Sequence, residues 1–338
     1  MNGRERICSV LNGEWPDKRP VMLHNFMMVA REAGISMKTY REDPEKAATA
    51  HIEAVEKYDP DGILIDMDTA TLAGAAGVPV DFPEDEPART CGPLLHSLDD
   101  MGNLGGIDIS SDKRVGIWLE TCTIVKEHFG GEKYVRGNCD QAPFSLAGMV
   151  RGSENWMLDL ITQPEKAHRL LEYCTGLTIQ FIRLMAQTGV DMVSNGDSLS
   201  GPELISPELY KSFAFPYEKE VAGAAHELGL PYVLHICGNT DRIVEDMVKT
   251  GADGLELDYM TNITWIKHCL AGRTVFLGNL DPVSVLEQGS PAQVQEKVLE
   301  LLNLFEDEPG FILNSGCAIP PDTPEENIKT MIRSIRSF

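Results

Sequence analysis

The stretch of residues 232–258, YVLHICGNTDRIVEDMVKTGADGLELD, contains a strand, a helix and a second strand in direct succession. Its first part, Tyr232–Cys237, is apolar and rich in β-formers, and Thr240–Thr250 has the periodicity of a helix. Gly251 stands where a helix C-cap glycine is expected, and the apolar run Gly254–Asp258 follows almost at once. A strand, helix and strand in this order predict two parallel strands of one sheet.

The same alternation extends over the whole chain. Six further β-rich runs are Pro20–His24, Gly62–Asp66, Tyr134–Cys139, Asp191–Asn195, Val275–Asn279 and Phe311–Ser315. Further helices are expected at Pro44–Lys57, Trp156–Leu171, Pro207–Leu228, Pro291–Phe305 and Pro324–Ile335. Eight strands without a Gly-rich dinucleotide fingerprint favour a closed (β/α)8 TIM barrel over an open doubly wound sheet. We expect a single barrel domain over residues 1–338, with a loop insertion at about residues 75–112.

The composition limits the classes of partner. The formal net charge of -23 would repel a polyanion, so a nucleic-acid partner is not expected. No run of about 18 apolar residues is present, and the N-terminal segment lacks the apolar core of a signal peptide. We therefore expect a cytoplasmic protein without a membrane partner. The eight cysteines do not indicate a disulfide framework in that location, and a homodimer is left open.

Polar residues follow most of the predicted strands. In α/β barrels the active site lies at the C-terminal ends of the strands, so these residues are the functional candidates. We predict catalytic roles for the acids Asp66, Asp197 and Asp258. We predict substrate contacts for His24, Asn25, Asp68, Cys139 and Asn195. Taken singly, each could instead be a hydrogen-bonded core group or a helix cap.

One histidine and two cysteines form a possible metal site. His235 and Cys237 are two residues apart on one strand, so their side chains point to the same face. Cys317 follows a glycine at the end of another strand and could supply a third ligand. One nitrogen and two thiolates suit zinc, and three protein ligands would leave a fourth position for substrate. Glu256 is a further possible ligand, and the alternative is a buried imidazole beside an inert thiol.

Five stretches resemble the uroporphyrinogen decarboxylase superfamily of barrels, nearly from end to end. They are residues 62–79 (GILIDMDTATLAGAAGVP), 137–152 (GNCDQAPFSLAGMVRG), 200–221 (SGPELISPELYKSFAFPYEKEV), 235–258 and 314–331 (NSGCAIPPDTPEENIKTM). The pattern H-x-C with a late G-C-x-I-P-P is similar to the zinc methyltransferase branch of that superfamily. That branch includes methylcobamide:coenzyme M methyltransferases and the methyltransferase components of O-demethylases. The resemblance implies that His235, Cys237 and Cys317 bind zinc.

The chain departs from true uroporphyrinogen decarboxylases in two places. Those enzymes carry an Arg-rich segment after the first strand, whereas this chain reads HNFMMVAREAG, with His24 and Asn25 at the matching positions. They also have a histidine where this chain has Cys317. Asp66 matches their substrate-binding aspartate. Porphyrinogen decarboxylation is therefore the least favoured of the functions considered.

The resemblance implies methyl transfer to or from the cobalamin of a separate corrinoid protein. The chain itself lacks the cobalamin signature D-x-H-x-x-G, because Ala224 stands where its aspartate would be. We favour a methoxylated substrate, an aryl methyl ether, because the run Phe26–Met28 is apolar. The alternative is a methylcobalamin:thiol methyltransferase of the coenzyme M type. The insertion at 75–112 could act as a lid or docking surface, or be a plain insertion.

Overall fold

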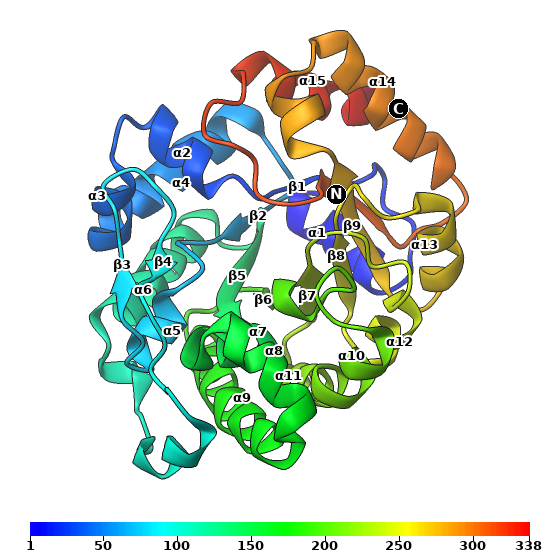
Figure 1. Cartoon of the computed structure of the whole chain (residues 1–338). Helices are drawn as coiled ribbons and strands as arrows, with labels where there is room; N and C mark the ends of the chain where they lie inside the picture. The colour runs from blue at the N-terminus through cyan, green and yellow to red at the C-terminus, as the bar shows by residue number, and fades with distance from the viewer.

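The computed structural model describes residues 1–338 and consists of a closed barrel of eight parallel strands (Figure 1). In spatial order these are β1 (Met22–Leu23), β2 (Gly62–Ile65), β5 (Tyr134–Gln141), β6 (Met192–Gly196), β7 (Tyr232–Ile236), β8 (Gly254–Leu257), β9 (Val275–Leu280) and β10 (Phe311–Ser315). The barrel closes where Val21 pairs with Leu313, whose N–H donates to the Pro20 carbonyl at 3.0 Å. The predicted (β/α)8 barrel is confirmed.

The strands are buried on both faces, as their apolar sequences require. Every residue of β7 is buried, and the same holds for β8, β9 and β10. The helix α1 (Gly3–Leu11) covers the N-terminal end of the barrel. Its Ile7 and Val10 pack on a small apolar layer that includes Met22 and Ile312. Apolar side chains therefore close this end, and the polar strand ends gather at the opposite mouth.

The other helices surround the barrel (Figure 1). They are α2 (Phe26–Glu32), α3 (Met37–Glu42), α4 (Pro44–Tyr58), α5 (Thr71–Ala75), α6 (Lys113–Phe129), α7 (Pro143–Arg151), α8 (Ser153–Thr162), α9 (Pro164–Ala186), α10 (Pro207–Phe213), α11 (Phe215–Glu227), α12 (Val244–Lys249), α13 (Ile263–Leu270), α14 (Pro291–Leu304) and α15 (Glu325–Ser337). Short turns η1 (Leu98–Asn103), η2 (Ile109–Ser111), η3 (Ser198–Ser200) and η4 (Pro282–Glu287) lie in the loops. No helix combines the length and the apolar character that spanning a bilayer requires.

Two expected helices are each divided by a proline. The segment expected as one helix over Trp156–Leu171 breaks between α8 and α9 at Pro164. The segment over Pro207–Leu228 breaks at Ala214, just before Pro216 in the first turn of α11. Proline has no N–H to donate and its ring clashes with the preceding turn, so each starts a new helix. The long helix α6 was not among the expected elements.

The insertion between α5 and α6 contains a short hairpin, β3 (Val80–Asp81) paired with β4 (Arg89–Thr90). The buried Arg41 of α3 fixes its turn, because the guanidinium donates to the carbonyl oxygens of Pro83 at 3.0 Å and Glu86 at 2.7 Å. Pro87, in the same turn, lines the cavity at the barrel mouth. The insertion therefore contributes one wall of that cavity.

Candidate metal centre

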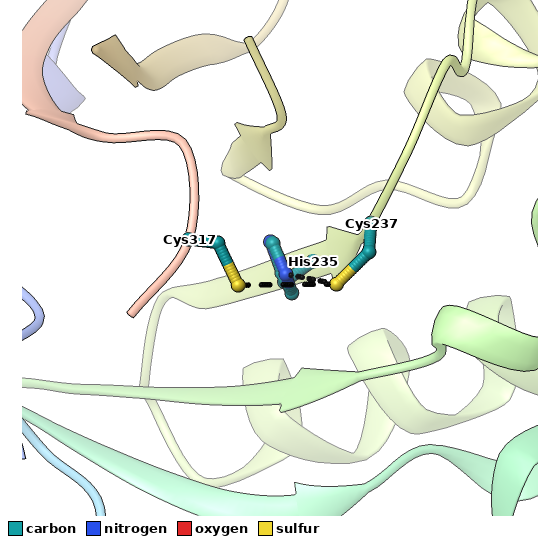
Figure 2. Close-up of side chains that lie close together, drawn as sticks. All are labelled: His235, Cys237 and Cys317. Atoms are coloured by element: carbon teal, nitrogen blue, oxygen red, sulfur yellow. Dashed lines mark hydrogen bonds between the residues drawn. The ribbon is translucent and has the colours of Figure 1, made fainter. Parts of the chain in front are cut away.

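The three predicted metal ligands meet at the mouth of the barrel (Figure 2). His235 lies near the end of β7, Cys237 directly after it, and Cys317 two residues after β10. One ligand atom from each lies within 4.8 Å of the other two. His235 Nε2 is 3.0 Å from Cys237 Sγ, and the two sulfur atoms are 4.0 Å apart. One nitrogen and two sulfurs at this separation could hold a single borderline-soft cation such as zinc.

Each of the three groups shifts the pKa of at least one of the others. The hydrogen bond from Cys317, opposed by burial and supported by His235, lowers the pKa of Cys237 to about 3. Burial alone would lower the pKa of His235, but the Cys237 thiolate raises it to about 10. The pKa of Cys317 is raised well above its usual value by the hydrogen bond to Cys237 and by burial. A metal ion bound here would replace the proton that His235 Nε2 and Cys237 Sγ share, because both groups bind metal only in their deprotonated forms.

Glu256 orients the histidine from the other side of the ring. Its backbone carbonyl oxygen is 3.0 Å from His235 Nδ1, which leaves Nε2 directed at Cys237. Such a contact fixes the tautomer and direction of a metal-binding imidazole. The Glu256 carboxylate also lies on the Nδ1 side, with Oε1 3.5 Å from that atom. We call the group of His235, Cys237 and Cys317 the ligand cluster. Glu256, which the sequence analysis considered as a fourth ligand, does not belong to it.

Two neighbours hold Cys237 in place. The hydroxyl of Ser198 in η3 donates to Cys237 Sγ at 3.0 Å. The turn after Cys237 contains Gly238 with φ +80, and the Gly238 N–H donates to Asp258 Oδ2 at 3.0 Å. A positive φ of this kind is readily adopted only by glycine. The position of the sulfur is therefore set by β6 and β8 as well as by its own strand.

The ligand cluster opens onto a cavity of about 230 Å³. Part of its wall is apolar and includes the side chains of Phe26, Met27 and Ala318. Apart from the three candidate metal ligands, its polar wall comes from the ends of β1, β2, β5, β6 and β8 and consists of His24, Asp66, Thr69, Arg136, Asn138, Asp140, Gln141, Asn195, Ser198 and Glu256. This volume fits a small substrate.

A buried network of charges forms one side of this cavity. Arg136 forms an ion pair with Glu256, which also accepts from Asn314 Nδ2 at 3.0 Å. His24 lies between two carboxylates, 3.0 Å from Asp66 Oδ2 and 3.4 Å from Glu256 Oε1. Burial would raise the pKa of Glu256, but Arg136 and His24 lower it well below its usual value. Each buried charge is thus compensated by an opposite one.

The other predicted site residues divide into two groups. Asp66, His24 and Asn195 line the cavity beside the ligand cluster. Asp258 binds backbone N–H groups of its own turn and of Gly238, and Asp197 Oδ1 accepts from Ser145 N at 2.7 Å. Neither acid lines the cavity, so the geometry supports structural rather than catalytic roles for both. Three predicted substrate contacts are also absent from the lining, namely Asn25, Asp68 and Cys139.

Asp68, Cys139 and Asp197 lie outside the cavity lining because each is buried in another part of the protein. Asp68 accepts from the N–H groups of Ala70 and Thr71, each at 2.8 Å, and so initiates the turn into α5. Cys139 packs in the main core. Asp197 shares a buried site with Glu218 on α11, and desolvation raises its pKa to about 6. Asp68 is thus held by its own turn, whereas Asp197 has one satisfied oxygen and one buried oxygen, Oδ2, without a partner.

Three polar residues of the cavity lining, Arg136, Asp140 and Ser198, were given no role of their own in the sequence analysis. A detectable signal existed for the first, because Arg136 is a charged residue inside a run that reads as a buried strand. Asp140 has φ +59 at a register shift between β5 and β6, which no sequence pattern specified. Ser198 lies in a polar loop where nothing distinguished it from its neighbours.

The whole chain matches a family of known enzymes. Residues 2–338 match the sequence model of the family described as uroporphyrinogen decarboxylase (URO-D). The chain belongs to the uroporphyrinogen decarboxylase family. Within this family, it is 32% identical to the methylcobamide:CoM methyltransferase of Methanosarcina acetivorans, over 72% of this chain and 70% of that protein. It is 28% identical to the uroporphyrinogen decarboxylase of Thermus thermophilus, over 98% of this chain and 97% of that protein.

A solved structure has the same fold. A methyltransferase from Methanosarcina mazei superposes with a TM-score of 0.92, covering 100% of this chain and 99% of that chain at 22% sequence identity. The uroporphyrinogen decarboxylase family is a family of enzymes, and the methyltransferases among these relatives support an enzyme that transfers methyl groups.

Proposed function

We propose that this protein transfers a methyl group between the cobalamin of a separate corrinoid protein and a small thiol, with zinc held by His235, Cys237 and Cys317. The observation that carries the proposal is the convergence of these three side chains within 4.8 Å at the end of a barrel whose relatives include methylcobamide:CoM methyltransferases. Coenzyme M is a thiol, so these relatives support a thiol acceptor more than the methoxylated substrate favoured from sequence. An aryl methyl ether stays an untested alternative.

The chemistry suits the site. Zinc, when bound, supplies a Lewis acid that keeps a substrate thiol ionised at neutral pH. The thiolate sulfur attacks the methyl carbon of methyl-cob(III)alamin, so a C–S bond forms and the Co–C bond breaks. The electron pair of the broken Co–C bond stays on cobalt as cob(I)alamin, and the thiol proton passes to solvent. The residues of this chain hold the ligands in place: Glu256 directs Nε2 of His235, and Ser198 donates to Cys237.

Metal analysis and methyl transfer test the proposal together. We expect about one zinc per chain after anaerobic purification, and loss of methylcobalamin absorbance when a thiol is added. Cys317→Ser should lower both metal content and methyl transfer by about 100-fold or more, since it removes a ligand rather than a supporting contact. Cys91→Ser is the matched control, because Cys91 is an exposed free cysteine outside the cluster. A metal-free wild-type protein, or full activity in Cys317→Ser, would contradict the proposal.

A further inference from the structure

The wall of the cavity formed by β5 and β6 carries two hydrogen-bond acceptors without partners. Asp140 and Asn195 both line the cavity, and each residue is 1% exposed to solvent. Asp140 Oδ1 and Asn195 Oδ1 are buried and accept no hydrogen bond within the protein. Leaving such atoms unsatisfied is costly, so they indicate a group that binds here.

The local structure fixes both acceptors. Asp140 Oδ2 accepts from Leu72 N at 2.7 Å, which holds the carboxylate and leaves its other oxygen free. Asn195 Nδ2 donates to the Cys139 carbonyl oxygen at 2.6 Å, so its amide oxygen is the free atom. The backbone of Asp140 lies in the left-handed region at φ +59, a conformation that is costly for residues other than glycine, asparagine and aspartate. This geometry directs two free acceptors at a ligand, whereas the free donor of the same wall, Arg136 Nε, belongs to a guanidinium that is already paired with Glu256.

The charges of the cavity favour a cation at the same place. Its lining contains the carboxylates Asp66, Asp140 and Glu256, and apart from the ligand cluster its cations are Arg136 and His24. Arg136 is paired with Glu256, and His24 lies between Glu256 and Asp66. Asp140 is thus the one acidic group of the lining without a cationic partner there. Burial, together with the charge of Asp68, raises the pKa of Asp140 well above its usual value, and a bound cation would oppose that shift. An anionic group, such as the sulfonate of coenzyme M, would find no unpaired cation on this wall.

We propose that Asp140 and Asn195 bind the ammonium group of a small aminothiol, and that thiols of this class are the methyl acceptors of this protein. The inference rests on the proposed function and adds the substrate class. An ammonium group has three donors and one positive charge. It can satisfy both free oxygens and compensate Asp140 while its sulfur is directed at the cluster of His235, Cys237 and Cys317 on β7 and β10.

Binding of three thiols to the metal-loaded full-length protein tests this inference. The probes are 2-aminoethanethiol, 2-mercaptoethanol and 2-mercaptoethanesulfonate, which share a two-carbon chain and differ in tail charge. Affinity is measured by titration calorimetry and by the thiolate charge-transfer absorbance of the cobalt-substituted protein. We expect the aminothiol to bind about tenfold more tightly than the sulfonate, equal to about 1.4 kcal/mol. Equal or tighter binding of the sulfonate would overturn the inference.

Two variants test whether the preference for the aminothiol depends on Asp140 or on the negative charge of the protein in general. Asp140→Asn keeps an oxygen for Leu72 N and tolerates the left-handed backbone, but removes the charge. It should abolish most of the aminothiol preference while leaving the affinity for 2-mercaptoethanol unchanged. Asp246→Asn removes a buried carboxylate that does not line the cavity, and should retain the preference. An unchanged preference in Asp140→Asn, in a protein whose circular dichroism and melting temperature match wild type, would refute the role of Asp140.

Methyl transfer from methylcobalamin to the same three thiols distinguishes the two proposals. Transfer to the sulfonate as readily as to the aminothiol would support the proposed function and overturn the inference. Binding of the aminothiol that depends on Asp140, without transfer to any thiol, would support the inference and contradict the proposed function. No binding of any thiol would overturn both.

Discussion

At the scale of single residues, the sulfur of Cys237 depends on a neighbour that is not itself a ligand candidate. The Ser198 hydroxyl donates to this sulfur at 3.0 Å from the loop after β6. Hydrogen-bond donors around a metal-bound thiolate reduce its charge and fix its direction, so their removal lowers metal affinity. With the proposed function, Ser198 is therefore a positioning residue whose removal should lower metal affinity.

We expect Ser198→Ala to weaken metal affinity by about 10–100-fold, the usual effect of removing such a contact. The cobalt-substituted protein should also show a shifted thiolate charge-transfer band, a change that general loosening of the fold would not produce. Competition with a chelating dye measures the affinity. Ser198→Thr keeps a hydroxyl and should restore most of it. An unchanged spectrum in Ser198→Ala would exclude an interaction with Cys237.

At the scale of elements, the Cys317 loop is positioned by close packing between the ends of β8 and β10. Gly316 leaves no room for a side chain, because an added Cβ would lie 2.7 Å from Tyr259 N and 3.1 Å from Asp258 Cα. Gly316→Ala should therefore displace the loop, lower the stability by about 1–3 kcal/mol and reduce metal affinity. Gly105→Ala is the control, since a Cβ there meets nothing within 4 Å. Chemical denaturation and metal titration measure both effects, and a wild-type metal affinity in Gly316→Ala would contradict this account.

Strands were the elements that the sequence specified best. Buried parallel strands are continuous apolar runs, so all eight could be found within about two residues of their bounds. The three candidate ligands, which the structure brings together, could be predicted from the alternation along β7, the rule that barrel strands end at the active site, and the family resemblance. Asp197 and Asp258 lie outside the cavity lining, because they follow β6 and β8 in loops where the alternation no longer predicts side-chain direction. Arg136 was detectable as a charged residue within an apolar strand, but the pattern did not indicate its role.

At the scale of the whole molecule, a buried histidine makes stability depend on pH. His51 of α4 is 1% exposed, and its Nε2 lies 2.6 Å from the hydroxyl of Tyr40, which donates to the Asp66 carbonyl. Burial, with a smaller effect from His24, lowers the pKa of His51 from 6.5 to about 3. The unfolded chain therefore takes up a proton below pH 6.5 that the folded protein does not, and stability falls as the pH falls.

This one group should cost about 2 kcal/mol of unfolding free energy between pH 7.5 and pH 5. Urea denaturation of wild type and His51→Gln at these two pH values measures the effect. The variant should be less stable at pH 7.5, because a buried contact is altered, yet its stability should decline less on acidification. Parallel declines of the two proteins would show that His51 does not titrate differently in the folded and unfolded states.

The closure of the barrel between β1 and β10 has a consequence for biogenesis. Cys317 follows β10, and β10 gains both of its neighbours only when the ring of strands is complete. A nascent polypeptide that has left the ribosome only as far as β9 already carries His235 and Cys237 but cannot yet present the third donor. With the proposed function, the metal site would therefore be complete only after translation of the final strand.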